Sequence, residues 1–433
     1  MIKDNAKTQK PDPRGCAVRA LEWVFSRHKS LDVFLEKDQR FGALPTRDKA
    51  LSRAIIGSSL RHLGQIDAII DTFLSRPMPR QAVTARQILR AGAAELLFLR
   101  SASHGVVNSF VQMAGNVRVS RPYKGMINAL LRRIDREGEE LLQTLPLELN
   151  IPTWLSENWN KTYGPDTVKQ AAIALKEPPL LDLTVFEDIE KWTQLLDGTA
   201  IGDQTVRLLH KGRIEELEGY DSGKWIVQDL AASIPVQILN PQAGEEIADI
   251  CAAPGGKTVQ IAVTGAKVTA LDNQQARLSR LSQNLERTGQ SAEIICADAR
   301  SWKPEQLFDA ILLDAPCSAT GIFRPHPDVL YNRREKDLAG FAERQVSLTI
   351  NASKLLKPQG RLIYCVCSAQ SIEAEDVIAE ILNKTDLKLD PITTDIPSFA
   401  EPFQKDGMIR IPPGALPVEG GLDAFFIAKL RKT

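Results

Sequence analysis

A chain of 433 residues is too long for one ordinary hydrophobic core, so its length predicts about two to four domains. Its composition, 43% hydrophobic and 25% charged with no long apolar run, is typical of soluble globular proteins and excludes a membrane-spanning protein. The net charge of zero conceals an asymmetry: residues 1–140 hold 24 Lys and Arg against 14 Asp and Glu, which leaves 30 against 40 in residues 141–433.

The basic first part indicates a polyanionic partner, although a solvated basic face without a partner would have the same composition. The first residues, Met1 to Arg14, lack the apolar core of a secretory signal, so we expect a cytoplasmic protein. The six cysteines lack the paired spacing of metal sites. We therefore expect free thiols in a reducing compartment and no bound metal.

Residues 13–136 are predicted to form an all-helical domain, because apolar residues recur with a helical period and strand-like alternation is absent. The expected helices are Pro13–His28, Thr46–Leu63, Ile66–Leu74, Gln81–Leu99, Ser103–Val117 and Tyr123–Ile134. Basic side chains lie mostly off the apolar stripes, which would leave them free to bind phosphates. They are Arg19, Arg27, Arg47, Lys49, Arg53, Arg61, Arg118, Arg121, Lys124, Arg132 and Arg133.

Residues 140–223 are predicted to form a small α/β linker domain, with helices near 153–162, 165–175 and 187–195 and an extended run at 180–185. In residues 224–433 strands and helices alternate, which is the pattern of a doubly wound, mostly parallel α/β sheet of the Rossmann-like kind. The expected strands are 244–250, 268–272, 292–296, 309–314 and 361–367, followed by 408–411 and 423–430, the last of them antiparallel.

The first of these strands runs into D-I-C-A-A-P-G-G-K-T, residues 249–258, and this strand–turn–helix form lets a backbone approach a nucleotide-like ligand closely. We therefore expect a cofactor at Cys251, Ala252, Ala253, Pro254, Gly255, Gly256 and Lys257. Asp272 ends the next strand, where a doubly wound sheet places the acid that binds a ribose. A phosphate loop is one alternative, weakened by Cys251 in place of its first glycine, and a turn without a ligand is another.

Two later strands end in cysteines. Asp314-Ala315-Pro316-Cys317 ends one strand, and Cys365-Val366-Cys367-Ser368 ends the next. Because neighbouring strands lie about 4.8 Å apart and ligands bind at their carboxyl ends, Cys317 and Cys367 should converge on one pocket beside the cofactor turn. Cysteine is also often buried in strands as a small hydrophobic residue, but two thiols together with Asp314 favour a catalytic site.

These stretches resemble the S-adenosylmethionine-dependent RNA (cytosine-5)-methyltransferases of the RsmB/Sun type. The matching segments are 248–258, Asp272, Asp298, 314–321 and 364–368, and the helical first part is similar to the NusB-type RNA-binding domain of this subgroup. The chain departs from the family pattern at Ala319, where glycine is usual, and at Val366, where threonine is usual.

The resemblance implies a site in which Cys367 is the nucleophile that adds to cytosine C6, because C5 alone is too weak a nucleophile to attack a sulfonium methyl group. It implies that Asp314 binds the N3/N4 edge of the base and also lies at the cofactor, and that Cys317 assists product release. It assigns Lys257 to steering Asp314 or lowering a thiol pKa, and Asp298 to the adenine amino group. The segment 324–328 is expected to line an RNA cleft.

The implied substrate is a cytosine in an unpaired loop of 16S ribosomal RNA, methylated by a monomer. A catalytically lapsed ribosome-assembly or antitermination factor is the alternative from another class, although a pure binding protein needs neither thiol. A DNA (cytosine-5)-methyltransferase is the enzymatic rival, and it would use the Cys317 thiol as its nucleophile.

Overall fold

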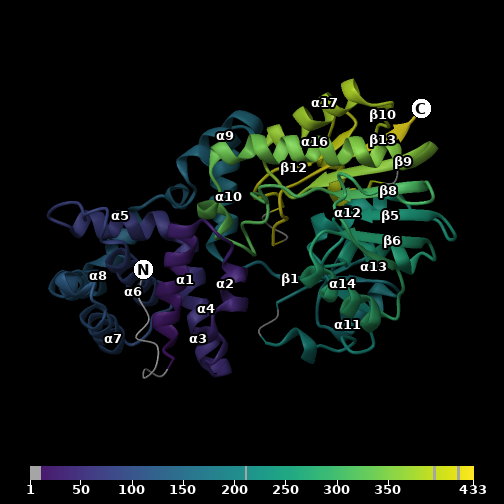
Figure 1. Cartoon of the computed structure of the whole chain (residues 1–433). Coiled ribbons are helices and arrows are strands. Elements are labelled where there is room, and N and C mark those ends of the chain that lie inside the picture. Colours follow the sequence, from purple (N-terminus) through teal and green to yellow (C-terminus); the bar gives the residue numbers. More distant parts are fainter. Residues whose placement is uncertain (1–10, 210–211, 394–395, 417–419) are drawn as a thin grey trace. The chain divides into compact units, whose positions relative to one another are not determined.

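The computed structural model describes residues 11–209, 212–393, 396–416 and 420–433, and it divides into two compact units (Figure 1). The first unit extends to Glu157 and also contains Ala171–Glu177 and Pro325–Arg334. The second unit holds Asn158–Gln170, Pro178–Arg324 and Glu335–Thr433. Two short segments from later in the chain therefore belong to the compact unit that is mostly built from its beginning.

The first unit is helical, as predicted. Asp12 caps the first helix by accepting a hydrogen bond from the Gly15 amide, and Pro13 at the first helical position has a suitable φ. The helices are α1 (Pro13–Arg27), α2 (Leu31–Lys37), α3 (Gln39–Gly42), α4 (Thr46–Arg61), α5 (Leu63–Phe73), α6 (Val83–Leu97), α7 (Ser103–Asn116) and α8 (Lys124–Thr144). The short α2 and α3 were not expected, and α8 is longer than expected because it continues past Ile134 with a charged outer face.

The segment Pro325–Arg334 packs into this helical unit. Its helix α15 (Val329–Asn332) lies against α1, and Asp328 accepts a hydrogen bond from the Leu31 amide at 2.9 Å. The Tyr331 hydroxyl donates toward the carbonyl oxygens of Leu60 and Asn150, each at 2.9 Å. The prediction that 324–328 forms an open RNA-lining loop is therefore wrong for Asp328, which is buried among the helices.

A four-stranded antiparallel sheet follows two helices, α9 (Thr153–Tyr163) and α10 (Asp166–Lys176). Its strand order is β2-β3-β1-β4, made of β1 (Leu181–Val185), β2 (Thr199–Ile201), β3 (Thr205–Leu208) and β4 (Trp225–Val227), with α11 (Ile189–Leu195) between the first two strands. Only β1 was expected, because the other strands are three or four residues long and give no clear alternation. A buried ion pair joins Arg207 to Asp182 at 2.6 Å.

The predicted doubly wound, mostly parallel sheet is confirmed. Its strand order is β11-β12-β13-β9-β8-β5-β6-β7, with β10 paired to β13. Strands β7, β6, β5, β8 and β9 are parallel to one another. The added strands β12 and β13 are antiparallel to their neighbours. The strands are β5 (Glu246–Ile250), β6 (Lys267–Asp272), β7 (Glu293–Cys296), β8 (Phe308–Asp314), β9 (Leu356–Val366), β10 (Leu387–Leu389), β11 (Gln404–Lys405), β12 (Met408–Ile411) and β13 (Phe425–Lys432).

Helices cover both faces of this sheet because successive side chains of each strand point to opposite sides. Ile363 and Leu312 pack with α12 (Leu230–Leu239), whereas Leu362 and Ile311 pack on the side of α16 and α17. The remaining helices of this part are α13 (Gly256–Val263), α14 (Gln275–Thr288), α16 (Leu338–Lys354) and α17 (Glu375–Lys384).

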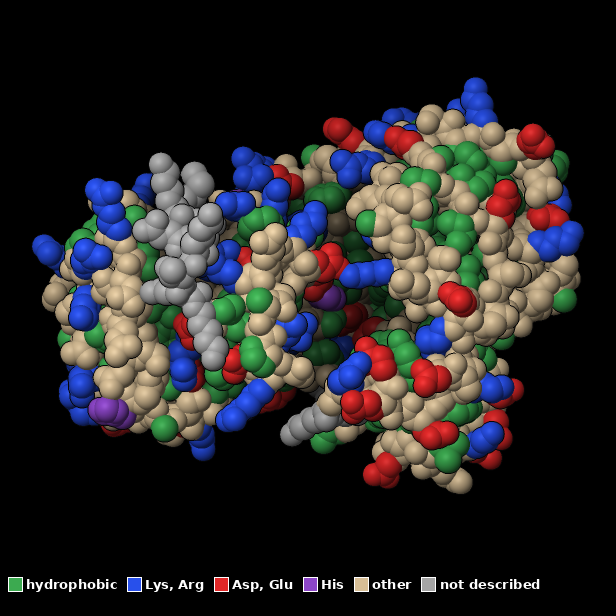
Figure 2. Space-filling view, turned by 60° about the horizontal axis from the view of Figure 1, so that its bottom comes forward, with side chains coloured by type: hydrophobic (Ala, Val, Ile, Leu, Met, Phe, Trp, Pro, Cys, Tyr) green, Lys and Arg blue, Asp and Glu red, His purple; other side chains and the backbone are tan. Residues whose placement is uncertain are grey.

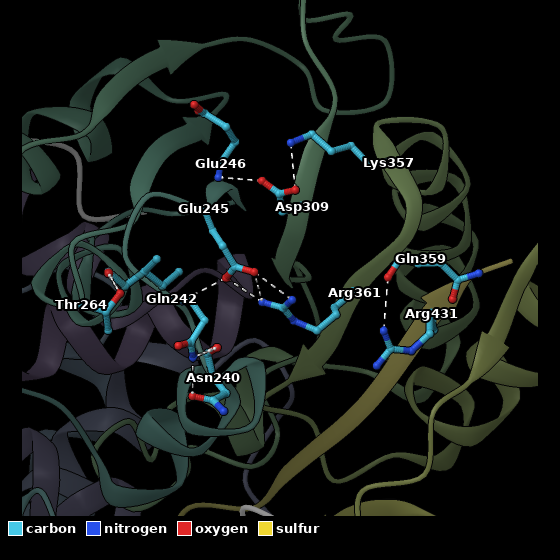
Figure 3. A network of polar contacts seen from close by, with 11 residues as sticks. Asn240, Gln242, Glu245, Glu246, Thr264, Asp309, Lys357, Gln359, Arg361 and Arg431 are labelled. Atoms are coloured by element: carbon cyan, nitrogen blue, oxygen red, sulfur yellow. Dashed lines mark hydrogen bonds and ion pairs between the residues drawn. The ribbon is translucent and has the colours of Figure 1, made fainter.

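Ion pairs join the amino ends of the central strands (Figure 3). Arg361 of β9 donates to both carboxylate oxygens of Glu245, at 3.0 and 2.7 Å. Lys357 donates to Asp309 at 2.8 Å, and the same carboxylate accepts a hydrogen bond from the Glu246 amide at 3.0 Å. These contacts fix β5, β8 and β9 to one another at the edge opposite the predicted site.

Candidate active site

The turn after β5 has the backbone form that the cofactor prediction requires. Cys251 has φ 64° and Gly255 has φ 102°, both in the left-handed region. A Cβ on Gly255 would lie 2.9 Å from Cγ of Leu281, so no larger residue fits between the turn and α14. Gly255 has no side chain to cap α13, which leaves the first amides of that helix available to an anionic group such as a carboxylate.

A buried carboxylate, Asp249 of β5, contacts the helix that follows this turn. Its Oδ2 accepts a hydrogen bond from the Thr258 hydroxyl at 2.6 Å, and its Oδ1 has no hydrogen-bond partner among the described residues. Burial raises the pKa of Asp249 to about 7, while the Thr258 hydrogen bond and Lys257 oppose the rise. We did not select Asp249 from the sequence, because inside an apolar strand it gave no sign of its contact with Thr258.

Asp272 ends β6 beside this turn, and only 2% of its side chain is exposed. Its Oδ1 accepts a hydrogen bond from the Gln274 amide at 3.0 Å, and its Oδ2 pairs with Arg277 at 3.0 Å. Arg277 also donates to the carbonyl oxygen of Ala253. A carboxylate at this position of a doubly wound sheet fits a ribose diol, and Arg277 joins Asp272 to the turn at Ala253.

Asp298 lies two residues after β7, and the Ala297 amide hydrogen-bonds to the Asp272 carbonyl oxygen at 3.2 Å. The Asp298 carboxylate is 41% exposed and pairs with Arg300 at 2.6 Å. Hydrogen bonds from the Arg300 side chain and amide lower the pKa of Asp298 to about 2. The chain therefore brings Asp298 next to Asp272 through the backbone, and its carboxylate already has a cationic partner.

The predicted contact between Lys257 and Asp314 is present. The Lys257 ammonium group donates to Asp314 Oδ2 at 2.9 Å, and 11% of the lysine side chain is exposed. Burial opposes the charged form of Lys257, but the charge and hydrogen bond of Asp314, together with the charges of Cys365 and Asp249, outweigh it and raise the lysine pKa. Asp314 Oδ1 accepts a weaker contact from the Cys365 thiol at 3.8 Å. Lys257 thus joins the cofactor turn to the end of β8.

The two predicted catalytic thiols converge. The Sγ atoms of Cys317 and Cys367 lie 3.5 Å apart, close enough for one thiol to donate to the other. Their loops are joined by a hydrogen bond of 3.0 Å from the Gly321 amide to the Cys367 carbonyl oxygen. A Cβ on Gly321 would lie 2.8 Å from that oxygen, so only glycine allows this approach. The hydrogen bond with Cys367, together with burial, raises the pKa of Cys317 well above its usual value.

Glu373, which the sequence analysis did not select, connects both thiol loops. Its fully buried carboxylate accepts hydrogen bonds from the Ser318 amide at 2.8 Å and from the Ser318 and Ser368 hydroxyls, each at 2.5 Å. Gln345 of α16 donates to the same carboxylate at 3.1 Å. Each serine directly follows one of the two cysteines. Glu373 thereby fixes the position of one thiol relative to the other.

The two residues that depart from the family pattern, Ala319 and Val366, differ in their structural environments. Ala319 has φ 58°, a conformation that costs a non-glycine residue roughly 1–2 kcal/mol. The fully buried Val366 packs in the apolar cluster on the α16 side of the sheet and pairs with Phe426. A threonine hydroxyl there would lie in that apolar cluster.

Lys and Arg side chains are scattered over the visible face of the helical unit (Figure 2). Arg47, Arg118 and Lys124 are exposed, as the prediction of a phosphate-binding face requires. Arg61 is an exception, because it is 7% exposed and donates to the Leu175 carbonyl oxygen at 3.1 Å. Lys3, Lys7 and Lys10 contribute to the basic balance but lie outside the described residues.

No group of three or more His, Cys, Asp or Glu in the described ranges could hold a metal ion. Likewise, no helix in the part of the chain that the structure describes is long and apolar enough to cross a membrane.

Comparison with known proteins places both parts of the chain. Residues 236–431 match the family described as 16S rRNA methyltransferase RsmB/F, and residues 11–136 match the NusB family. The ribosomal RNA small subunit methyltransferase B of Citrobacter koseri is 35% identical over 98% of this chain and 100% of its own length. That of Shigella flexneri is also 35% identical, over 97% of this chain and 98% of its own.

Solved structures agree on the fold. One crystal structure covers 98% of this chain and 100% of its own with a TM-score of 0.74 at 23% identity. A methyltransferase homologue from Pyrococcus horikoshii has a TM-score of 0.55 at 26% identity and covers 65% of this chain and 95% of its own.

Proposed function

This chain belongs to the ribosomal RNA small subunit methyltransferase B family, and from that premise we propose how its own residues carry out the reaction. It is an S-adenosylmethionine-dependent methyltransferase that acts on C5 of cytosine in 16S ribosomal RNA, so the predicted activity and cofactor are confirmed. The proposal concerns the roles of individual side chains and the form of the RNA. The 3.5 Å contact between the Cys317 and Cys367 thiols is the observation that carries it.

The residues around the turn fit the cofactor. We assign the backbone from Cys251 to Lys257 to its methionine end, because the uncapped first amides of α13 can bind a carboxylate. Asp272 is assigned to the ribose hydroxyls, and Asp298 to the adenine amino group. S-adenosylmethionine, when bound, supplies the methyl group as an electrophilic sulfonium.

The reaction begins with addition to the base. The Cys367 thiolate forms a bond to C6 of the cytosine, and the electron pair of the C5–C6 double bond moves to C5, which becomes nucleophilic enough to take the methyl group. Asp314 accepts a hydrogen bond from the N4 amino group and holds the base in place. Lys257 orients Asp314 through their 2.9 Å contact.

Product release reverses the addition. A base removes the C5 proton, the C5–C6 double bond forms again, and the bond from C6 to the Cys367 sulfur breaks. The raised pKa of Cys317 keeps that thiol protonated at neutral pH, so it can give its proton to the departing Cys367 thiolate across 3.5 Å. Cys317 is therefore a proton donor. The presence of both thiols also argues against a binding protein without catalysis, which would need neither of them.

The form of the substrate follows from access to C5 and C6. A base must leave its stack to reach the thiols, which is easiest in an unpaired loop, so we propose a single-stranded segment of 16S ribosomal RNA. Residues 13–136 act as the RNA-binding domain through exposed Lys and Arg, residues 140–223 as a linker domain, and residues 224–433 as the methyltransferase domain. We propose that the enzyme works as a monomer in the cytoplasm.

The thiol roles are tested by incubating variants with substrate RNA and S-adenosylmethionine and then running denaturing gels. Cys367→Ala should abolish both turnover and the covalent RNA complex, because no bond to C6 can form. Cys317→Ala should accumulate a complex that resists denaturant, because attack and methyl transfer proceed while release slows. A complex that accumulates in Cys367→Ala and is absent in Cys317→Ala would reverse the two roles.

A further inference from the structure

The second compact unit contains a cavity that the reaction described above does not use. It has a volume of about 600 Å³, within the range of small-molecule and nucleotide sites. Its lining residues come from the end of α9, the start of α17 and strand β12, among others. The lining residues that matter are Tyr163, Ser371, Glu375, Lys405, Arg410 and Phe426.

Arg410 is the unusual member of this cavity. Its side chain is 7% exposed, yet its three guanidinium nitrogens have no hydrogen-bond partner among the described residues. Its guanidinium carbon lies 5.2 Å from the ring centre of Tyr163 and 5.5 Å from that of Phe426. Burial raises the pKa of Tyr163, and the nearby charge of Arg410 opposes that rise. A buried charge with unsatisfied donors is costly, so a ligand that accepts from Arg410 would remove a large penalty.

A carboxylate beside Arg410 restricts the chemistry of that ligand. Glu375 Oε1 lies 3.6 Å from Arg410 Nε, longer than a hydrogen bond, and Glu375 Oε2 is buried without a partner among the described residues. The cavity thus offers donors and an acceptor side by side. A phosphodiester has only acceptors and would be repelled by Glu375. A nucleobase edge has an acceptor next to a donor, and its flat faces suit the aromatic rings and the guanidinium plane.

The cavity adjoins the loop that carries Cys367. Arg410 pairs with Phe426 across β12 and β13, and Phe426 pairs with Val366 across β13 and β9. Two strand spacings amount to roughly 10 Å, which separates the backbone at Arg410 from that at Val366, the residue before the nucleophile. The Tyr163 hydroxyl also donates to the carbonyl oxygen of Ala369 at 3.1 Å, two residues after Cys367.

We propose that this cavity binds a second unstacked nucleobase of the substrate RNA, close in sequence to the methylated cytosine, with Arg410 donating to its acceptor and Glu375 accepting from its donor. The proposal rests on the activity toward ribosomal RNA and is independent of the roles assigned to the two thiols. It makes Arg410 a residue that selects the sequence or shape around the target.

The test uses the full chain and a set of 16S ribosomal RNA fragments, each with one abasic ribose near the methylated cytosine. For the wild type, one abasic position should raise KM about 10-fold to 100-fold, the usual loss for one stacked base, with a smaller change in kcat. Arg410→Gln should raise KM by a similar factor on intact RNA and should lose all further sensitivity to that abasic position, because both changes remove the same contact.

Lys405→Gln is the matched control, because Lys405 lines the same cavity but is exposed, so it should keep the abasic sensitivity. Arg410→Met tests for a structural role: its thermal midpoint should stay close to that of the wild type, because it removes buried donors that lack hydrogen-bond partners together with the 3.6 Å ion pair to Glu375. S-adenosylmethionine affinity, measured by calorimetry, should match the wild type in all three variants.

Three results would overturn the proposal. Wild-type KM could respond to no abasic position, or it could respond only to a neutral methylphosphonate linkage, which would mean that Arg410 holds a phosphate. Alternatively, Arg410→Gln could add the same factor to every abasic RNA, which would mean that the guanidinium acts only by overall charge or packing.

Discussion

In the nine-stranded sheet, charged side chains are arranged differently at the amino ends and at the carboxyl ends of the parallel strands. At the amino edge, Arg361 donates to both oxygens of Glu245 and Lys357 pairs with Asp309 (Figure 3). At the carboxyl ends, beside the paired Lys257 and Asp314, one buried oxygen of Asp249 and three nitrogens of Arg410 lack a hydrogen-bond partner among the described residues. Paired charges stabilise a fold, whereas buried polar atoms without hydrogen bonds are retained where a ligand or a reaction uses them. The contacts at the amino ends of these strands therefore serve stability, whereas the groups at their carboxyl ends serve binding and the reaction.

Outside the two thiols, the largest expected effect is at Glu373, at the carboxyl ends of the strands. Glu373→Ala should lower kcat by about 100-fold, because the two serines beside the thiols lose their shared acceptor and the reacting groups shift. Steady-state methylation of RNA measures this. Glu373→Gln keeps an acceptor and should lose less, and Glu245→Ala on the amino edge should leave kcat unchanged. An unaltered kcat in Glu373→Ala, with a lower thermal midpoint, would show that the contact is only structural.

Asp272 should have the next largest effect, on cofactor affinity. Asp272→Asn should raise the Kd for S-adenosylmethionine by about 10-fold or more, because a charge-assisted hydrogen bond to the ribose is lost. Asp298→Asn should change the Kd less, because that carboxylate is 41% exposed and already paired with Arg300. Calorimetry with S-adenosylmethionine gives both values, with ATP and Mg²⁺ as the negative control. Equal losses in both variants would contradict the proposed ribose and adenine assignments.

The amino edge should respond in stability alone. Arg361→Met leaves Glu245 half-buried without its partner and should lower the free energy of unfolding by about 1–3 kcal/mol. Burial favours the neutral form of Glu245, but the hydrogen bonds and charge of Arg361, together with the hydrogen bond from the Gln242 amide, outweigh it and lower the Glu245 pKa. The kcat of the folded variant should equal that of the wild type. Denaturant unfolding and activity on the same sample separate the two, and a large loss of kcat would mean that the two edges are coupled.

The last prediction concerns the pH dependence of stability at Asp249. Its folded pKa of about 7 is above the unfolded value, so its contribution to stability is complete below about pH 4 and is lost as the pH rises through 7. Asp249→Asn cannot ionise and keeps an acceptor for Thr258, so its stability relative to the wild type should increase from pH 4 to pH 7 and then level off. Unfolding curves at several pH values test this, and a constant difference would refute the shifted pKa.

The sequence by itself determined the class of fold, because strand and helix periods in residues 224–433 follow from local side-chain patterns. It also determined Cys317, Cys367 and Asp314 as one site, because parallel strands bring their carboxyl ends together. Short strands such as β2 and β3 were missed because they are stabilised by pairing and not by their own pattern.

Only the tertiary structure decided the partners of buried polar groups. Glu373 and Arg410 are ordinary charged residues in the sequence, on a helical turn and a short strand. The role of Glu373 depends on its contacts with Ser318 and Ser368, and that of Arg410 on its contact with Tyr163. These partners lie between 5 and 247 positions away in the sequence. No local pattern records which distant group will meet a side chain, because burial and hydrogen bonding are set when the strands and helices pack.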